Sequence, residues 1–195
     1  MFLEPNHRRK DGTGPGWIEV ISGSMFSGKT EELIRRLKRA MLASEQVEIF
    51  KPLLDNRYSL SKVVSHDANE IPSHGVESAV EIIPLSKDFD VVGIDEAQFL
   101  GSELVEVVNQ LANNGKRVIV AGLDMDFKGI PFEPMDQLMA IAEYVTKVHA
   151  VCMQCGNMAS FSYRLNDKEE KIVIGEQGTY MALCRSCFYE KMSQD

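Results

Sequence analysis

Apolar positions along the chain follow two different patterns. Short runs of consecutive apolar residues, typical of strands buried on both faces, predict strands at 17–21, 46–51, 89–94, 116–123 and 144–151. Between these runs, apolar residues three and four positions apart predict helices around 33–41, 104–112 and 135–142. Strands that alternate with helices in this way predict an α/β domain with a largely parallel sheet flanked by helices.

The inner face of the first expected helix is formed by Leu33, Ile34, Leu37, Ala40 and Met41. Other segments are less distinct. Residues 63–66 favour a short strand, and residues 76–87 fit either a short helix or a short strand. Residues 161–165 and 171–174 predict a hairpin around Asn166 and Asp167.

Composition divides the chain into three parts. Residues 1–16 are polar, basic and rich in Gly and Pro, so we expect a disordered tail. Residues 17–150 carry the alternating strands and helices and form the expected α/β domain. Residues 151–195 begin and end around paired cysteines and predict a second, small domain.

A phosphate-binding motif lies between the first strand and the first helix. The motif G-x-x-x-x-G-K-T is spelled by Gly23, Ser24, Met25, Phe26, Ser27, Gly28, Lys29 and Thr30. A strand, a glycine-rich loop and a helix in this order direct backbone N–H groups and a helix N-terminus at phosphate. Lys29 would reach the β- and γ-phosphates, and the Thr30 hydroxyl would bind Mg²⁺. The motif predicts a P-loop NTPase-type fold that binds a nucleoside triphosphate.

Two adjacent acids follow the apolar run at 89–94. An acid after a buried strand downstream of a P-loop is the pattern of a second magnesium-binding position, which here is Asp95. Glu96 is placed to orient a hydroxyl or to accept its proton, although a surface carboxylate at a strand end is the alternative.

Two further loops carry candidate residues. Phe127, Pro131 and Phe132 follow the strand at 116–123 and fit a pocket for a flat base or ordinary loop packing equally well. Asp55 and Arg57 are candidates for a substrate or phosphate contact, but their spacing alone favours an exposed pair.

Four cysteines form two C-x-x-C pairs, Cys152 with Cys155 and Cys184 with Cys187. Four thiolates on two such turns predict a closed, structural zinc site, with a redox pair or two disulfides as the alternatives. The glycine-rich stretch 175–180 before the second pair could form a flap that covers a substrate.

Charge and hydropathy narrow the function classes. The net charge of −8 over 195 residues argues against broad nucleic-acid binding, although a local basic patch remains compatible with it. No window is long and apolar enough to span a membrane, and the first residues lack the apolar core of a signal peptide. We therefore expect a cytoplasmic protein.

Two classes of enzyme fit these features. The first is a kinase for a small hydroxyl substrate, and the second is an ATPase that acts on nucleic acid or protein through a zinc ribbon. The acidic balance and the short chain favour the kinase. A nucleotide-binding regulator without turnover is a third interpretation, which Glu96 disfavours.

From about residue 17 onward, the chain resembles the cellular-type (type II) thymidine kinases. The resemblance depends on four stretches: Met25 to Thr30, Asp95 to Phe99, Gly122 to Asp124 with Phe127, Pro131 and Phe132, and Tyr180 before the second cysteine pair. It implies ATP-dependent phosphorylation of the 5′-hydroxyl of thymidine or deoxyuridine, feedback inhibition by dTTP, and a homotetramer.

The resemblance also implies residue roles. Glu96 would be the general base, and Gly23 to Thr30 together with Asp95, Glu96, Ala97 and Gln98 would contact ATP. The substrate-binding set would be Met25, Asp55, Arg57, Phe99, Leu123, Phe127, Phe132, Ser162, Val173, Ile174 and Tyr180. Residues 164–180 would form a lasso loop that grips the pyrimidine through backbone groups. Gly178 departs from the acidic residue that many members carry there, and residues 1–16 extend beyond the family core.

Overall fold

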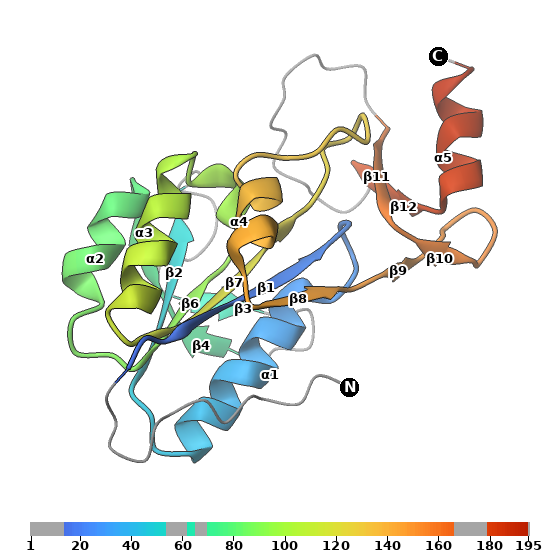
Figure 1. The fold of residues 1–195 in the computed structure, drawn as a ribbon. Helices are drawn as coiled ribbons and strands as arrows, with labels where there is room; N and C mark the ends of the chain where they lie inside the picture. Colours follow the sequence, from blue (N-terminus) through green and yellow to red (C-terminus); the bar gives the residue numbers. More distant parts are fainter. Residues whose placement is uncertain (1–13, 54–61, 65–69, 166–178, 195) are drawn as a thin grey trace.

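A computed structural model describes residues 14–53, 62–64, 70–165 and 179–194 (Figure 1). Its centre is a six-stranded sheet in the order β5-β2-β6-β7-β1-β8, in which every pairing is parallel. The strands are β1 (Trp17–Gly23), β2 (Val47–Pro52), β5 (His74–Val76), β6 (Val91–Ile94), β7 (Arg117–Leu123) and β8 (Tyr144–Lys147). The predicted α/β class with a parallel sheet is confirmed.

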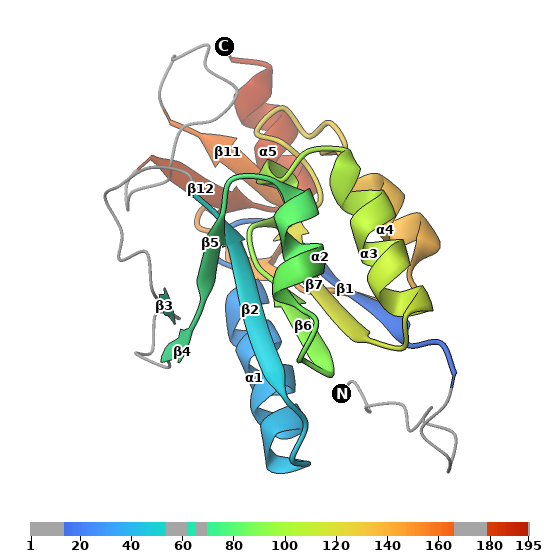
Figure 2. The same cartoon turned by 90° about the vertical axis from the view of Figure 1, so that its left-hand side faces the viewer.

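Helices cover both faces of this sheet (Figures 1 and 2). On one face lies α1 (Lys29–Leu42), whose buried residues pack with apolar side chains of β1, β2, β6 and β7. On the other face lie α2 (Ile82–Leu85), α3 (Glu103–Asn113) and α4 (Met135–Ile141). Because the strands are buried on both faces, they appear in the sequence as continuous apolar runs.

The inner face of α1 differs from its prediction at one end. Leu33, Ile34, Leu37 and Ala40 are buried as expected, but Met41 is 41% exposed, so its predicted place in the core is wrong. Met41 falls in the last turn, beyond the part of α1 that packs on the sheet. One further α1 residue, Arg36, is fully buried.

Arg36 belongs to a buried ionic network centred on Glu19 of β1. Arg36 Nη1 donates to Glu19 Oε2 at 2.8 Å, and Arg117 Nε donates to Glu19 Oε1 at 2.7 Å. Trp17 Nε1 also donates to Glu19 Oε1, at 2.8 Å. Each charge is therefore paired in the interior, which a buried ion requires.

The predicted strand 144–151 is wrong as a single element. It divides into β8 in the large sheet and β9 (Ala150–Val151), which pairs with β10 (Met158–Ala159) in a separate ribbon. The division follows Val148, whose N–H donates to Ser22 O at 2.8 Å before the chain leaves the sheet.

The expected short strand and the undecided segment both contain defined elements. Of the strand expected at 63–66, the first two residues belong to β3 (Lys62–Val64), which pairs antiparallel with β4 (Glu70–Pro72) outside the large sheet, and residues 65–66 lie outside the described residues. Residues 76–87 contain the end of β5, the 3-10 turn η1 (Ala79–Glu81) and α2, so strand and helix both occur.

The C-terminal part, residues 150–165 and 179–194, is referred to below as the cysteine module. It contains β9 and β10, the antiparallel pair of β11 (Phe161–Arg164) and β12 (Tyr180–Leu183), and α5 (Arg185–Met192). A small core of its own includes Phe161, Leu183, Phe188 and three of the cysteines. In the predicted hairpin, the partner segment 171–174 lies outside the described residues, and β11 pairs with β12.

Most of the predicted N-terminal tail, residues 1–13, also lies outside the described part of the chain. Gly16, at its end, donates its N–H to Ala112 O at 2.7 Å. Among the helices in the described ranges, none is sufficiently long and apolar to cross a membrane.

Candidate active site

The P-loop connects the carboxyl end of β1 to the first residue of α1. Gly23 ends β1, and a Cβ built there would lie 2.3 Å from the carbonyl oxygen of Val148, so only glycine fits this close approach. The loop ends at Gly28, and α1 begins at Lys29. The strand, loop and helix that the motif requires are therefore all present.

Lys29 folds back over the loop that carries it. Its Nζ donates to Ser24 O at 2.7 Å, and Ser27 Oγ donates to the same oxygen at 2.7 Å. Desolvation by burial lowers the pKa of the Lys29 ammonium, and the carboxylates of Glu96, Asp95 and Asp124 oppose that shift. A partly buried cation near several acids at a P-loop is placed to meet phosphate oxygens.

Asp95 follows β6 and lies beside the first turn of α1. The Thr30 hydroxyl donates to Asp95 Oδ2 at 3.1 Å, and the Asp95 side chain is buried. Desolvation, with the neighbouring Glu96 carboxylate, raises the pKa of Asp95 to about 7. A hydroxyl and a carboxylate are hard oxygen ligands of the kind that Mg²⁺ prefers, and a buried carboxylate with this pKa shift lacks full compensation by cations. Thr30 and Asp95 thus fit a magnesium ion.

Glu96 has an unusual backbone for a non-glycine residue. Its φ of 52° lies in the left-handed region, and its side chain is exposed at the carboxyl edge of the sheet. Gln98, in the 3-10 turn η2 (Ala97–Phe99), donates its Nε2 to Glu96 Oε2 at 2.6 Å. Strained conformations of this kind cluster at functional sites, and here the strain directs a carboxylate outward beside Asp95.

The predicted nucleoside residues in the sheet domain are partly exposed. This group comprises Met25, Phe99, Leu123, Phe127 and Phe132. Phe99 and Phe132 meet edge to face with centroids 6.2 Å apart, and the guanidinium carbon of Arg164 lies 3.5 Å from the Phe127 ring centroid. Partly exposed aromatic side chains near a strand end suit the stacking of a flat base.

One hydrogen bond joins the cysteine module to the P-loop. The backbone N–H of Met25 donates to Ser162 Oγ, on β11, at 2.9 Å. Tyr180 is buried in β12, where it pairs with Arg164 of β11. Four of the predicted substrate residues, Asp55, Arg57, Val173 and Ile174, lie outside the described residues, as does Gly178.

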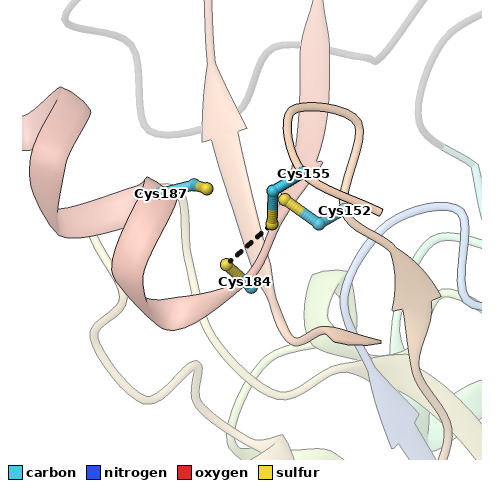
Figure 3. Close-up of side chains that lie close together, drawn as sticks. All are labelled: Cys152, Cys155, Cys184 and Cys187. Carbon is cyan, nitrogen blue, oxygen red and sulfur yellow. Dashed lines mark hydrogen bonds between the residues drawn. The ribbon is translucent and has the colours of Figure 1, made fainter. Parts of the chain in front are cut away.

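The four cysteines converge at one place in the cysteine module (Figure 3). Their sulfur atoms all lie within 4.8 Å of one another, and all four thiols are free of disulfides. Cys155 Sγ and Cys184 Sγ are 3.6 Å apart. Tetrahedral Zn–S bonds of about 2.3 Å place sulfurs about 3.8 Å apart, so the cluster fits zinc.

The pKa values of two of these thiols, Cys152 and Cys187, are shifted in opposite directions. Burial acts to raise the pKa of Cys152, but backbone N–H groups that donate to its sulfur outweigh burial and lower the pKa to about 6. Hydrogen bonds with the Cys155 and Cys184 thiols raise the pKa of Cys187. A cluster that already favours one thiolate is suited to a cation, because metal ligation needs deprotonated sulfur.

Two residues near the site received no role from the sequence. Asp124, directly after β7, is buried, and within the described part of the chain neither oxygen has a partner in hydrogen-bond geometry, although Lys147 Nζ lies 2.7 Å from Oδ2. Lys51, at the end of β2, has a pKa lowered by desolvation and opposed by Asp95. The available signal for both was a charged residue at the end of a buried strand.

The parallel sheet, the P-loop and the acid pair after β6 define a P-loop nucleotide-binding protein equipped for phosphoryl transfer. The family model for thymidine kinase matches residues 16–188. The chain therefore belongs to the thymidine kinase family.

Curated relatives agree with this assignment. A thymidine kinase from Bacteroides fragilis is 58% identical over 180 residues, covering 92% of this chain and 90% of that protein. One from Rhodothermus sp. is 58% identical over 188 residues, covering 96% and 88%, and one from Porphyromonas gingivalis is 55% identical over 186 residues, covering 95% and 90%. AMPPCP-bound DnaA from Aquifex aeolicus aligns with a TM-score of 0.41 at 18% identity, over 71% of this chain and less than half, 42%, of DnaA, which adds nothing to the family assignment.

Proposed function

We propose that the protein transfers the γ-phosphoryl group of ATP to the 5′-hydroxyl of thymidine, and that deoxyuridine is a second acceptor. The observation that carries this proposal is the placement of Glu96 beside Asp95, Thr30 and the P-loop. A carboxylate that faces outward there would be within reach of an acceptor hydroxyl near the terminal phosphate.

The P-loop residues Gly23 to Thr30 would bind the triphosphate of ATP. Lys29 would exchange its bond with Ser24 O for phosphate oxygens, and the loop N–H groups would surround the β-phosphate. Thr30 and Asp95 would hold Mg²⁺, which neutralises charge on the phosphates when bound. Glu96, Ala97 and Gln98 belong to the same nucleotide-contact motif in the family resemblance.

The chemical step is an in-line displacement at phosphorus. The 5′-oxygen of the nucleoside forms a bond to the γ-phosphorus as the bond to the bridging oxygen of ADP breaks. Glu96 accepts the proton that the hydroxyl loses, and Lys29 compensates the charge on the transferring group. Exclusion of bulk water limits hydrolysis of ATP at this stage.

The nucleoside would lie against Met25, Phe99, Leu123, Phe127 and Phe132. Ser162 and Tyr180 would contribute from the cysteine module, together with four residues outside the described part: Asp55, Arg57, Val173 and Ile174. Backbone groups of the lasso loop would recognise the N3–H and carbonyl edge of thymine, which rejects bases that lack this pattern. Zinc on Cys152, Cys155, Cys184 and Cys187 would support this loop at both ends.

Regulation and assembly follow the family resemblance. We propose feedback inhibition by dTTP, a homotetramer, and a cytoplasmic location. Inhibition by dTTP is physically reasonable, because one molecule would carry the thymine for the nucleoside site and a triphosphate for the P-loop.

The test is nucleoside-dependent ADP formation from Mg-ATP with thymidine, deoxyuridine, deoxycytidine, deoxyadenosine or no acceptor. We expect turnover with thymidine and deoxyuridine alone. Glu96→Gln should lower kcat by about 10²- to 10⁴-fold and leave ATP affinity intact, whereas the same substitution at exposed Glu106 should change neither.

Two results would contradict the proposal. ATP hydrolysis that needs no nucleoside would favour the alternative, an ATPase that acts on nucleic acid or protein through its zinc-binding part. Near-normal turnover in the Glu96→Gln variant would refute the assignment of the base.

A further inference from the structure

Gln98 is held by hydrogen bonds at both ends of its amide group. Its Nε2 donates to Glu96 Oε2 at 2.6 Å, and its Oε1 accepts the N–H of Leu123, the last residue of β7, at 2.9 Å. The Glu96 carboxylate needs a donor, which is the amide nitrogen, and the Leu123 N–H needs an acceptor, which is the amide oxygen. A flipped amide would place oxygen against the carboxylate and nitrogen against an N–H, so only one orientation satisfies both.

The space for this side chain is created by Gly122 on the neighbouring strand β7. A Cβ at Gly122 would lie 2.8 Å from Gln98 Oε1 and 2.6 Å from Met135 Sδ. Gln98 itself is 4% exposed. The amide therefore fills a fitted place between β7 and α4, and it does not extend freely toward solvent as a ligand-seeking side chain would.

Glu96 needs such a support more than an ordinary strand-end acid does. Its backbone is in the left-handed region at φ 52°, and its carboxylate is exposed. An exposed glutamate has several rotamers of similar energy, and most of them lose the alignment that proton transfer needs. The bond from Gln98 selects the rotamer in which Oε2 lies toward the buried amide.

We propose that Gln98 is a positioning residue that aims the Glu96 carboxylate, and that it does not act as a contact to ATP. Leu123, the other partner of Gln98, belongs to the set proposed to enclose thymine. The amide group therefore links the orientation of the Glu96 carboxylate to the end of β7, on which the nucleoside would lie. This inference rests on the proposed function, because it assumes that Glu96 accepts the proton.

The experiment is a cycle of four proteins: wild type, Gln98→Met, Glu96→Gln and the double variant. Methionine keeps the length of the side chain and removes both the donor and the acceptor. We expect Gln98→Met to lower kcat about tenfold or more while the KM for ATP stays within about twofold. In the Glu96→Gln background the same substitution should lower kcat no further, because the carboxylate that Gln98 positions is then absent.

Two controls separate positioning from general damage. Gln110→Met, on the exposed face of α3, should leave both constants unchanged. Gln98→Asn shortens the amide by one methylene so that it cannot reach both partners, and it should reproduce the kcat loss if the methionine variant fails to fold. Thermal unfolding and binding of a non-hydrolysable ATP analogue establish that each variant is folded and competent.

The outcomes are distinct. A KM for ATP that rises fivefold or more with kcat retained would overturn the inference in favour of a nucleotide contact. Equal loss of kcat in both Glu96 backgrounds would also overturn it and leave the proposed function standing. Normal turnover in Glu96→Gln alone would instead overturn the proposed role of the base.

Discussion

The large sheet and the cysteine module are stabilised in different ways. The sheet is covered on both faces by apolar clusters that include residues from α1 on one side and α2 to α4 on the other. The module has one small cluster, in which Phe161 stacks on Phe188 at a centroid distance of 4.5 Å and three of the four cysteines are core members. A core as small as that of the module is commonly supported by a crosslink or a metal, and its four cysteines could hold a metal ion.

The two regions nevertheless meet at the P-loop. Val148, where the chain leaves the sheet, has its carbonyl oxygen against Gly23, and Ser162 of the module accepts the N–H of Met25. The difference in stability therefore has a functional side. The loop that would bind phosphate is built on the large sheet and is also supported by the module whose four cysteines could hold a metal ion.

Removal of zinc should have the largest effect of the changes considered, and it should affect the module much more than the large sheet. Because the module lacks another sufficient core, we expect metal-free protein to lose nucleoside-dependent turnover by about 100-fold or more as the module unfolds locally. Hydrogen exchange should rise in residues 150–165 and 179–194, while α1 and α3 keep their protection. Zinc added back should restore both the turnover and the protection from hydrogen exchange. Full activity in protein shown by elemental analysis to be metal-free would contradict a metal requirement of the module.

Substitution of Glu19 tests how much the buried ionic network contributes to the stability of the large sheet. Glu19→Ala would leave Arg36 and Arg117 buried without their shared carboxylate, and we expect a loss of about 3–5 kcal/mol in the free energy of unfolding. Urea unfolding followed by far-UV circular dichroism measures this loss. Glu190→Ala, on the exposed face of α5, is the matched control and should cost less than about 0.5 kcal/mol.

A loss below about 1 kcal/mol in Glu19→Ala would show that the sheet tolerates the loss of the carboxylate that Arg36 and Arg117 share. The stability of the large sheet would then rest on its apolar clusters alone. The contrast with the module would become sharper in that event, because the ionic network would be dispensable.

The sequence predicts the parts of this fold that depend on local pattern. β1, β6 and β7 are visible because both faces of each strand are buried, and the cysteine pairs are visible because metal ligation needs those residues at that spacing. The P-loop and the acid pair Asp95 and Glu96 are visible for the same chemical reason. Their proposed roles remain predictions.

Features that depend on distant residues are not visible in this way. Arg36 interrupts an apolar face, and its burial depends on Glu19, Glu32 and Thr146, of which only one lies nearby in α1. Met41 has the right spacing but falls beyond the sheet. The strand predicted at 144–151 has no local signal at Val148 that the chain changes partners there.

The smallest expected effect concerns the bond that joins the two regions. Ser162→Ala leaves the partly buried N–H of Met25 without its acceptor, a change that costs about 0.5–1.5 kcal/mol at the P-loop. We expect the KM for ATP to rise about three- to tenfold in steady-state assays, with zinc content unchanged. Ser160→Ala, which removes the 3.1 Å contact to His149 Nδ1 on the same segment, should leave this constant unaltered. If only the KM for thymidine changes, Ser162 serves the nucleoside alone, and the module does not support the phosphate loop.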